Sequence, residues 1–267
     1  AVRLASSIGS GDAVARYGGD EFVVLIDCAK RNDALSVTLD HVKRAFDAPI
    51  AIDDVQLHVQ TSIGVTTYPV DGVDAESLLR NADLAMYRAK ALGRNSIQHF
   101  RAELAHEAKR RIALSRRLRE ALCAGAFELV YQPQLDTRSM TVTGVEALIR
   151  WNDAELGAVS PASFIPLAEE LGLIASIDEW VLNTACAQAK LWENTLPGVR
   201  MSINVSPRQL AKRDFHRTVR EALDKARLSP ERLEIEITER ALVAQGALPT
   251  LRALSDIGVA IAIDDFG

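Results

Sequence analysis

The pattern of hydrophobic positions divides the chain into two parts that predict different folds. In the first part, apolar alternation predicts a strand, a tight turn and a strand from 13 to 26, and a further strand over 57–69. Apolar residues at helical spacing predict helices over 33–47 and 74–95. These elements predict a compact α+β unit over residues 1–99.

After Gly125 the pattern changes to strands followed by helices. This order favours parallel strands joined by crossover helices, as in a (β/α) barrel or a doubly wound sheet. We favour the barrel because polar residues repeatedly stand near the ends of the apolar strands, where barrel enzymes build their sites. The expected strands are "FELVYQP", "TGVEALIRW", "VRMSINVS", "RLEIEITE" and "VAIAIDDFG", with helices near 161–174, 178–193, 215–226 and 248–256.

Residues 101–122, between the two parts, predict a basic helix. Its apolar residues fall near one stripe, with seven arginines or lysines in the segment: Leu104, Ala108, Ile112, Leu118 and Leu122. A solvated connecting helix is the favoured interpretation. A signalling or dimer helix with a short heptad-like seam stays open as the alternative.

The composition excludes several classes of protein. The net charge is −5 with 25% charged residues, so nothing indicates a DNA or RNA duplex as partner, and any bound nucleotide should be small. Three isolated cysteines suit a reducing cytoplasm. The apolar runs are strand-sized and no signal pattern is present, so we expect no membrane contact in this segment.

The ends of the chain predict that it is a fragment. It begins without methionine and stops at "AIAIDDFG", directly after an apolar run has delivered two aspartates. We expect a longer parent protein, whose N-terminal part could carry a sensor or a membrane segment.

Carboxylates and one amide interrupt the apolar strands of the second part. In "LEIEITE" the alternation of side chains places Glu234, Glu236 and Thr238 on the face opposite the leucine and isoleucines. Carboxylates inside strands cost several kcal/mol unless they are neutralised, and Asp, Glu and Asn oxygens suit Mg²⁺ or Mn²⁺. The alternative is that each faces solvent or pairs with an arginine. The positions concerned are Glu146, Asn204, Glu236, Asp264 and Asp265.

Other hydrolytic chemistries lack their signatures. The five histidines form no HxH or HExxH spacing, which disfavours a zinc hydrolase. No GxSxG sequence occurs, which disfavours a serine hydrolase.

Residues 113–267 resemble the EAL family of cyclic-di-GMP phosphodiesterases, which has a TIM-like barrel. The resemblance rests on a series of motifs in the family's order: "YQP", "EALIRW", "FIPLAEELGLI", "WVLNTAC", "INVSPRQL", "EIEITE" and "AIDDFG". Because the chain stops early, the resemblance implies an incomplete barrel.

The EAL resemblance implies roles for individual residues. Glu146, Asn204, Glu236 and Asp264 would be metal ligands, and Asp265 would bind a second metal. Gln132, Leu148 and Arg150 would contact the dinucleotide, with Arg150 on a phosphate, and Glu239 would support the metal site. The implied catalytic set is Glu146, Asp264, Asp265 and Glu239, and the implied reaction is metal-dependent hydrolysis of cyclic di-GMP to linear pGpG.

The chain departs from the EAL pattern in three places. Asn152-Asp153 stands where the family usually has histidine and proline, and the stretch between Glu239 and Leu251 is about two residues short. The family's later lysine, glutamate and glutamine are not in this sequence. We therefore expect residues 1–267 alone to be inactive.

The first part resembles the C-terminal portion of a GGDEF domain, the family of diguanylate cyclases. "RYGGDEF" and "ADLAMYRAKALGRN" carry this resemblance. It implies nucleotide-binding roles for Gly18, Gly19, Asp20, Glu21, Lys90 and Arg94, with Asp20 also on a metal. The family's inhibitory RxxD reads here as Gly9-Ser10-Gly11-Asp12, without the arginine.

Together the resemblances imply a tandem GGDEF–EAL signalling protein that hydrolyses cyclic di-GMP, with the GGDEF half as a GTP-binding regulator or a cyclase. Two alternatives stay open: an inactive module that binds cyclic di-GMP or GTP, and a net cyclase with a vestigial EAL half. Cyclase activity would require a homodimer, because it joins two GTP-loaded domains. The expected boundaries are 1–99, a connecting helix at 100–122, and 123–267.

Overall fold

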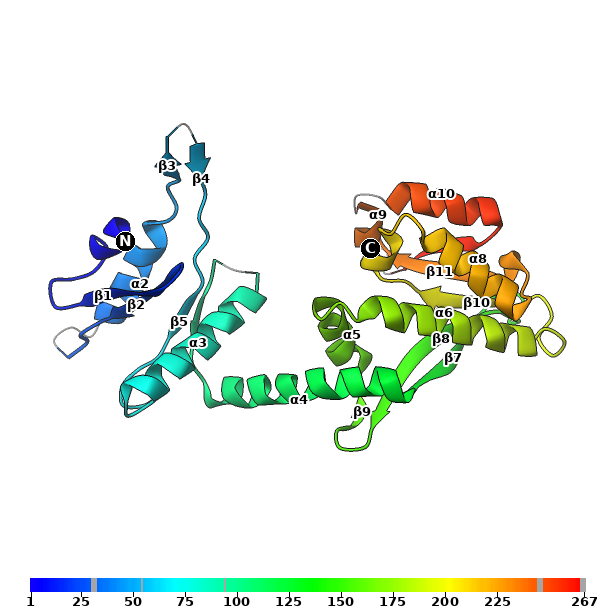
Figure 1. Ribbon diagram of the computed structural model, residues 1–267, viewed down its shortest axis with the longest axis horizontal. Helices are drawn as coiled ribbons and strands as arrows, with labels where there is room; N and C mark the ends of the chain where they lie inside the picture. The colour runs from blue at the N-terminus through cyan, green and yellow to red at the C-terminus, as the bar shows by residue number, and fades with distance from the viewer. Residues whose placement is uncertain (30–32, 54, 94, 244–246, 265–267) are drawn as a thin grey trace. The chain divides into compact units, whose positions relative to one another are not determined.

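The computed structural model describes residues 1–29, 33–53, 55–93, 95–243 and 247–264 (Figure 1). The chain separates into two compact units, Ala1–Arg110 and Arg111–Gly267. Helix α4 (Ala102–Ala124) contributes its first residues to one unit and the rest to the other.

The first unit is built from short strands and helices. Strands β1 and β2 form an antiparallel hairpin, β3 and β4 form another, and β5 pairs in parallel with β6. Helix α3 packs on β5 and β6. The elements are α1 (Val2–Ala5), β1 (Ala13–Gly18), β2 (Glu21–Leu25), α2 (Ala34–Arg44), β3 (Ile50–Ile52), β4 (Val55–Leu57), β5 (Ile63–Val65), α3 (Ala75–Ala91) and β6 (Ile97–His99).

Helix α3 is fixed at its start and along its length. Asp74 accepts a hydrogen bond from the backbone N–H of Ser77 at 2.7 Å, and the Ser77 hydroxyl oxygen accepts one from the Asp74 N–H, so the two form a capping box. A Cβ at Gly64 of β5 would lie 2.0 Å from the carbonyl oxygen of Ala82. Only glycine lets this strand and helix approach so closely.

The continuous strand predicted over 57–69 is wrong in extent. Regular strand is restricted to Val55–Leu57 and Ile63–Val65, and residues 58–62 have none. Alternating apolar and polar residues allow a segment to form a strand, but the strand forms only where a neighbouring strand is available for hydrogen bonding. Val55–Leu57 pairs with β3 and Ile63–Val65 pairs with β6, whereas residues 58–62 between them belong to no ladder.

The second unit is an α/β structure around one sheet, in the strand order β12-β11-β10-β8-β7, with β9 on β8. Strands β8, β10, β11 and β12 are parallel neighbours, as predicted. After α4 the elements are β7 (Phe127–Leu135), β8 (Val142–Asp153), β9 (Gly157–Val159), α5 (Pro161–Glu170), α6 (Ile174–Leu191), β10 (Arg200–Asn204), α7 (Pro207–Leu210), α8 (Phe215–Ala226), η1 (Pro230–Arg232), β11 (Leu233–Thr238), α9 (Glu239–Val243), α10 (Ala247–Ile257) and β12 (Ala260–Asp264).

Strand β7 differs from the parallel arrangement expected after Gly125. It pairs with β8 antiparallel, from Phe127 opposite Trp151 to Leu135 opposite Val142. The reason is local: the carboxylate of Asp136 accepts backbone N–H bonds from Arg138 and Ser139, which closes a tight turn. No helix can fit into so short a connection, so the two strands form a hairpin.

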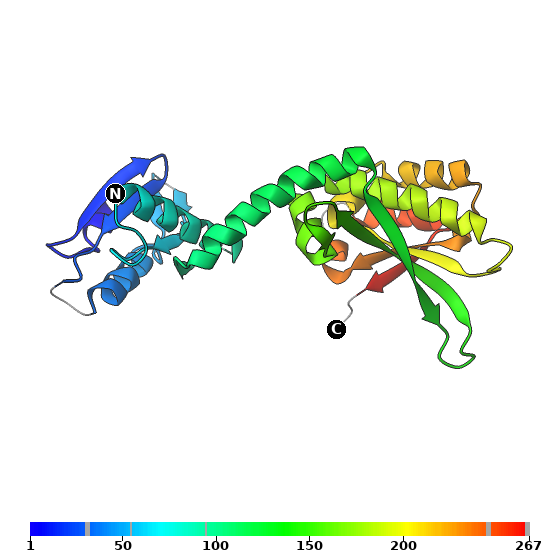
Figure 2. The same ribbon diagram turned by 90° about the horizontal axis from the view of Figure 1, so that it is seen from below.

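The two faces of this sheet have different surroundings. Helices α6, α8 and α10 lie over one face (Figure 2). The strand residues directed to that side are buried in the hydrophobic core: Val145, Ala147, Met201, Ile203, Leu233, Ile235 and Ile237. Side chains at alternate positions therefore lie on the opposite face.

The apolar stripe predicted for the connecting helix is wrong at Ile112, whose side chain is 72% exposed. The residues that pack against the core of the second unit are Leu114, Leu118, Ala121 and Leu122. Ile112 and Leu118 are six residues apart, which places them about 120° apart around a helix. Leu114, four residues before Leu118, shares its side of the helix. None of the helices in the described part of the chain has the length and hydropathy needed to span a bilayer.

Candidate functional site

Strand register aligns the predicted polar positions of the second unit. Glu146 on β8 lies opposite Gln132 on β7 and Ser202 on β10. Asn204 on β10 lies opposite Glu236 on β11. Thr238, two residues beyond Glu236, lies opposite Asp264 at the end of β12. All these residues stand on the face opposite the helices, toward the carboxyl ends of the parallel strands.

Two amide side chains contact the carboxylates on this face. Asn204 donates a hydrogen bond from Nδ2 to Oε1 of Glu146, at 2.7 Å. Gln134 of β7 donates from Nε2 to Oε1 of Glu236, at 3.1 Å. Glu236 is 8% exposed, Glu146 is half-buried and Asn204 is exposed. The site is therefore buried at Glu236 and open to solvent at Asn204.

Electrostatic repulsion is concentrated on Glu236. Burial, followed by the negative charge of Glu146, raises the pKa of this carboxyl to about 7; the hydrogen bond from Gln134 opposes the rise, and Asp264 adds to it. The carboxylates of Glu146, Glu236 and Asp264, on three parallel strands of one sheet, therefore interact unfavourably when all are ionised. A cation among them would reverse the sign of this interaction.

The chemistry of these side chains fits a hard divalent cation. Glu146, Asn204, Glu236 and Asp264 offer carboxylate and amide oxygens, the ligands that Mg²⁺ and Mn²⁺ prefer. Within the described ranges, no three His, Cys, Asp or Glu side chains gather closely enough to hold a metal ion by themselves. The predicted ligand set also includes the amide of Asn204 and the carboxylate of Asp265. Asp265 lies outside the described residues.

The predicted substrate-contacting residues share this face. Gln132 is exposed, and Leu148 and Arg150 follow Glu146 at alternate positions along β8. The Arg150 guanidinium donates from Nη1 to the carbonyl oxygen of Ile149 at 2.9 Å. Glu239, predicted to support the metal site, begins α9 one residue after Thr238 and is exposed.

The Asn152-Asp153 departure from the EAL pattern has a structural explanation. Asp153 accepts backbone N–H bonds from Glu155 and Leu156, which closes the turn between β8 and β9. Its carboxylate also pairs with Arg117 of α4, at 2.9 Å. The amide of Asn152 donates to Oε1 of Glu128 on β7, at 2.7 Å. These residues therefore hold β8 to its neighbours at the end of the strand.

A buried carboxyl supports the segment that follows Asn204. Asp178 of α6 accepts a hydrogen bond from the Ser206 hydroxyl at 2.5 Å, and the same hydroxyl oxygen accepts the N–H of Gln209 at the start of α7. Burial raises the pKa of Asp178 to about 6, although the bonds from Ser206 oppose the rise.

The β1–β2 hairpin carries the predicted nucleotide-binding turn of the first unit. Gly18 does not have a positive φ, although two glycines at a tight turn suggest one for each; it ends β1 and pairs with Glu21. The turn consists of Gly19, at φ +53°, and Asp20. Arg16 fixes it by donating from Nε and Nη2 to the Gly19 carbonyl oxygen, at 2.9 and 2.7 Å. Asp20 and Glu21 are exposed.

Lys90, the remaining described residue predicted to bind nucleotide, is exposed on α3. Among the residues described for this unit, no hydrogen bond or ion pair joins Lys90 to the turn. Arg94 lies outside the described residues. Asp12, the remaining acid of the RxxD position, accepts backbone N–H bonds from Gly9 at 2.9 Å and Asp27 at 3.0 Å, so it has a structural role here.

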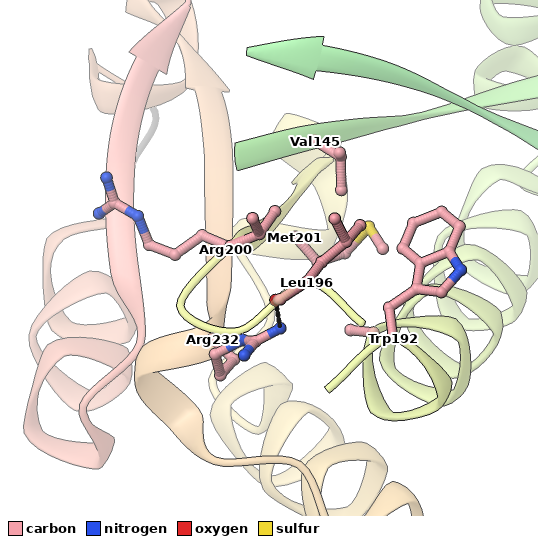
Figure 3. A pocket seen from close by; sticks show the side chains of 8 residues that line it. Val145, Trp192, Leu196, Arg200, Met201 and Arg232 are labelled. Carbon is pink, nitrogen blue, oxygen red and sulfur yellow. Dashed lines mark hydrogen bonds between the residues drawn. The ribbon is translucent and has the colours of Figure 1, made fainter. Parts of the chain in front are cut away.

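An apolar pocket on the helix-covered side of the sheet offers no second site (Figure 3). Val145, Trp192, Leu196 and Met201 are among its lining residues, and Arg232 donates from Nη2 to the Leu196 carbonyl oxygen at 3.1 Å. The pocket has no room for a water-sized molecule. The guanidinium of Arg200, another lining residue, ion-pairs with Glu234 at 3.1 Å.

Gln134, Asp178 and Arg16 were missed by the sequence interpretation. A signal existed for Gln134, since "YQPQ" places two glutamines at alternate positions, on one face of the same strand. No local pattern marks Asp178, because its partner Ser206 lies 28 residues away.

Comparisons with known proteins match both units. Residues 115–267 match the EAL domain model, and residues 1–96 match the model of the diguanylate cyclase GGDEF domain. An uncharacterized signaling protein of Caulobacter vibrioides is 41% identical over 99% of the chain. The bifunctional diguanylate cyclase/cyclic di-GMP phosphodiesterase MucR of Pseudomonas aeruginosa is 38% identical over the whole chain. The chain spans 33% and 39% of the length of these two relatives.

A solved structure gives the same assignment for the second unit. The PaMucR phosphodiesterase in a c-di-GMP complex has a TM-score of 0.56 and 39% identity, and the match covers 58% of this chain and 64% of that one. The unit that carries Glu146, Asn204, Glu236 and Asp264 on its parallel strands is therefore the part of the chain that matches the EAL domain. The chain belongs to the EAL domain family, and a segment that matches the GGDEF domain model precedes its EAL domain.

Proposed function

We propose that the intact protein hydrolyses cyclic di-GMP to linear pGpG in its EAL domain, with Mg²⁺ or Mn²⁺. The observation that carries this proposal is the alignment of Glu146, Asn204, Glu236 and Asp264 along neighbouring parallel strands, with the pKa of Glu236 raised to about 7 by burial and by Glu146. A purely structural set of carboxylates would be expected to carry arginine or lysine partners. Here Glu146 accepts a hydrogen bond from the neutral amide of Asn204, and Glu236 accepts one from the neutral amide of Gln134.

We assign the residue roles as follows. Glu146, Asn204, Glu236 and Asp264, with Asp265, hold divalent cations. When bound, these ions lower the pKa of water and offset charge on the phosphoryl oxygens. Gln132 and Leu148 contact the dinucleotide, Arg150 contacts a phosphate, and Glu239 supports the metal site. The neighbouring positions of Leu148 and Arg150, beyond Glu146 on β8, support an elongated substrate lying along that strand.

The GGDEF segment is proposed to bind GTP, as a regulator or as a cyclase. The observation in favour is the turn itself: Arg16 holds the Gly19 carbonyl, and Asp20 and Glu21 are exposed beside it. We assign this part to residues 1–99, the connecting helix to 100–122 and the EAL part to 123–267. A homodimer is expected for the cyclase activity, because it joins two GTP-loaded domains. We propose that this part of the protein lies in the cytoplasm, where both nucleotides occur.

The test is product analysis with the intact protein. Cyclic di-GMP is incubated with Mg²⁺, with Mn²⁺ or with EDTA, and the nucleotides are separated by chromatography. We expect pGpG with either metal and none with EDTA. Tight binding of cyclic di-GMP without turnover would replace the proposal by a receptor, and formation of cyclic di-GMP from GTP without pGpG would replace it by a net cyclase.

A further inference from the structure

A hydrogen bond that crosses the open face of the sheet connects Gln134 to Glu236. The donor is on β7 and the acceptor on β11, and β8 and β10 lie between them in the sheet. Neighbouring strands are about 4.8 Å apart, so three intervals in a flat sheet would separate the two backbones by roughly 14 Å. The two side chains nevertheless meet at 3.1 Å, which requires the Gln134 side chain to extend across β8.

Gly144 provides the space for this path. It is the residue of β8 directly opposite Gln134 in the β7–β8 register. A Cβ built at Gly144 would lie 2.3 Å from Oε1 of Gln134 and 3.4 Å from its Cδ. The φ of Gly144 is not in the left-handed region, so the backbone alone does not require glycine here. A side chain at this position would instead displace the amide of Gln134.

The amide of Gln134 is also chemically suited to support a carboxylate that binds a metal ion. A lysine or arginine at this position would neutralise Glu236 and compete with a bound cation, whereas an amide adds no charge. A neutral hydrogen bond restricts the orientation of the carboxylate and favours its ionised form, which are the functions of groups that support metal ligands.

We propose that Gln134 is a positioning residue that orients the Glu236 carboxylate for a divalent cation, and that Gly144 is present to admit its side chain. This inference rests on the proposed function, because it presupposes that Glu236 is a metal ligand. It adds a residue pair that acts through Glu236 and does not itself contact metal or substrate.

The test measures metal binding rather than turnover. Mn²⁺ is titrated into the intact protein by calorimetry at pH 8, without nucleotide. The part of the Mn²⁺ binding signal that is lost in Glu236→Ala is assigned to the proposed site. Gln134→Met keeps the length of the side chain and removes the donor, and we expect it to weaken this component about 10- to 100-fold. Gly144→Ala, which displaces the same amide, should weaken it in the same direction.

Two matched controls isolate the contact. Gln98→Met changes a half-buried strand glutamine of the first unit, and Gly11→Ala adds a Cβ that meets no atom within 4 Å. Both should bind Mn²⁺ like the wild type. Melting in EDTA provides the structural readout: Gln134→Met should melt within a few degrees of the wild type without metal, and should gain less stability when Mn²⁺ is added.

The possible failures are distinguishable. If Glu236→Ala leaves Mn²⁺ binding unchanged, the metal site and the proposed function both fail. If Glu236→Ala removes the component but Gln134→Met and Gly144→Ala retain wild-type affinity, the role of Gln134 is overturned and the proposed function stands. Should Gln134→Met fail to fold, the affinity of Gly144→Ala decides the question.

Discussion

Asn204 and Glu146 are joined across two parallel strands by a hydrogen bond of 2.7 Å, from Nδ2 to Oε1. The bond satisfies one carboxylate oxygen without neutralising its charge. A second bond of the same kind exists outside the site, between Asn152 Nδ2 and Glu128 Oε1, also at 2.7 Å. Comparing the two bonds tests the proposed metal site against a bond of the same kind elsewhere in the protein.

Asn204→Asp and Asn152→Asp should both lower the melting temperature in EDTA, by about 2–4 °C each, because a donor becomes a second carboxylate. Added Mn²⁺ should restore the melting temperature of Asn204→Asp alone, since only at position 204 would the new carboxylate become a metal ligand. Thermal melts of both variants with and without Mn²⁺ are the measurement. Equal responses of the two variants to Mn²⁺ would contradict a cation at Asn204.

The buried Asp178 predicts a pH dependence of stability. Its pKa is raised from 3.8 to about 6 in the folded state, chiefly by burial, so the folded protein binds a proton more tightly than the unfolded chain. The stability that this proton contributes is fully present below pH 4 and is lost as the pH rises through 6. The loss is on the order of 3 kcal/mol.

Asp178→Asn provides the reference, because it keeps an acceptor for Ser206 and cannot ionise. Urea unfolding of both proteins at pH 4, 5, 6 and 7 gives the difference in free energy of unfolding. The wild type should lose stability relative to the variant across this range. A difference that is constant, or that grows in favour of the wild type, would show that Asp178 is not held in a desolvated state.

The ion pair between Arg117 and Asp153 should hold α4 to the end of β8. Asp153→Asn removes the charge that pairs with Arg117 at 2.9 Å, and should lower the melting temperature of the second unit. Arg116→Met is the control, since its pair with Glu155 is 3.8 Å long and exposed on both sides. If the two variants melt alike, the Arg117 pair contributes no more than a surface contact.

The sequence predicted the faces of the parallel strands well, because alternation is a local property. In β11 the leucine and isoleucines are buried against the helices, and Glu236 lies on the other face, as expected. The amide contacts were not predictable in this way. Gln134 and Glu236 are 102 positions apart and meet only because of the register of the strands between them.

The errors have the same physical origin. Residues 58–62 have strand-like alternation but no partner, and Ile112 has an apolar side chain on a side of α4 that contacts no core. In both cases tertiary pairing decided the outcome over local preference. The antiparallel β7 was missed because the turn around Asp136 carries no glycine signal.

Substitutions in the β1–β2 hairpin should distinguish Gly19 of the turn from Gly18 at the end of β1. Gly19→Ala forces a Cβ into the left-handed region at φ +53°, which costs about 1–2 kcal/mol. Gly18→Ala meets no atom within 4 Å and has no such φ, so it should have a smaller effect on stability. Hydrogen exchange of the β1–β2 hairpin is the measurement. Faster exchange in Gly18→Ala than in Gly19→Ala would contradict this assignment of the turn.

We propose above that Glu146 and its neighbours form a metal site for hydrolysis of cyclic di-GMP. Its most direct test is the rate of pGpG formation by the intact protein with Mn²⁺, for the wild type, for Glu146→Gln, and for Glu221→Gln, an exposed helix residue. We expect turnover by the wild type and by Glu221→Gln, and a rate lower by roughly 100- to 1000-fold for Glu146→Gln. Wild-type turnover by Glu146→Gln would contradict it.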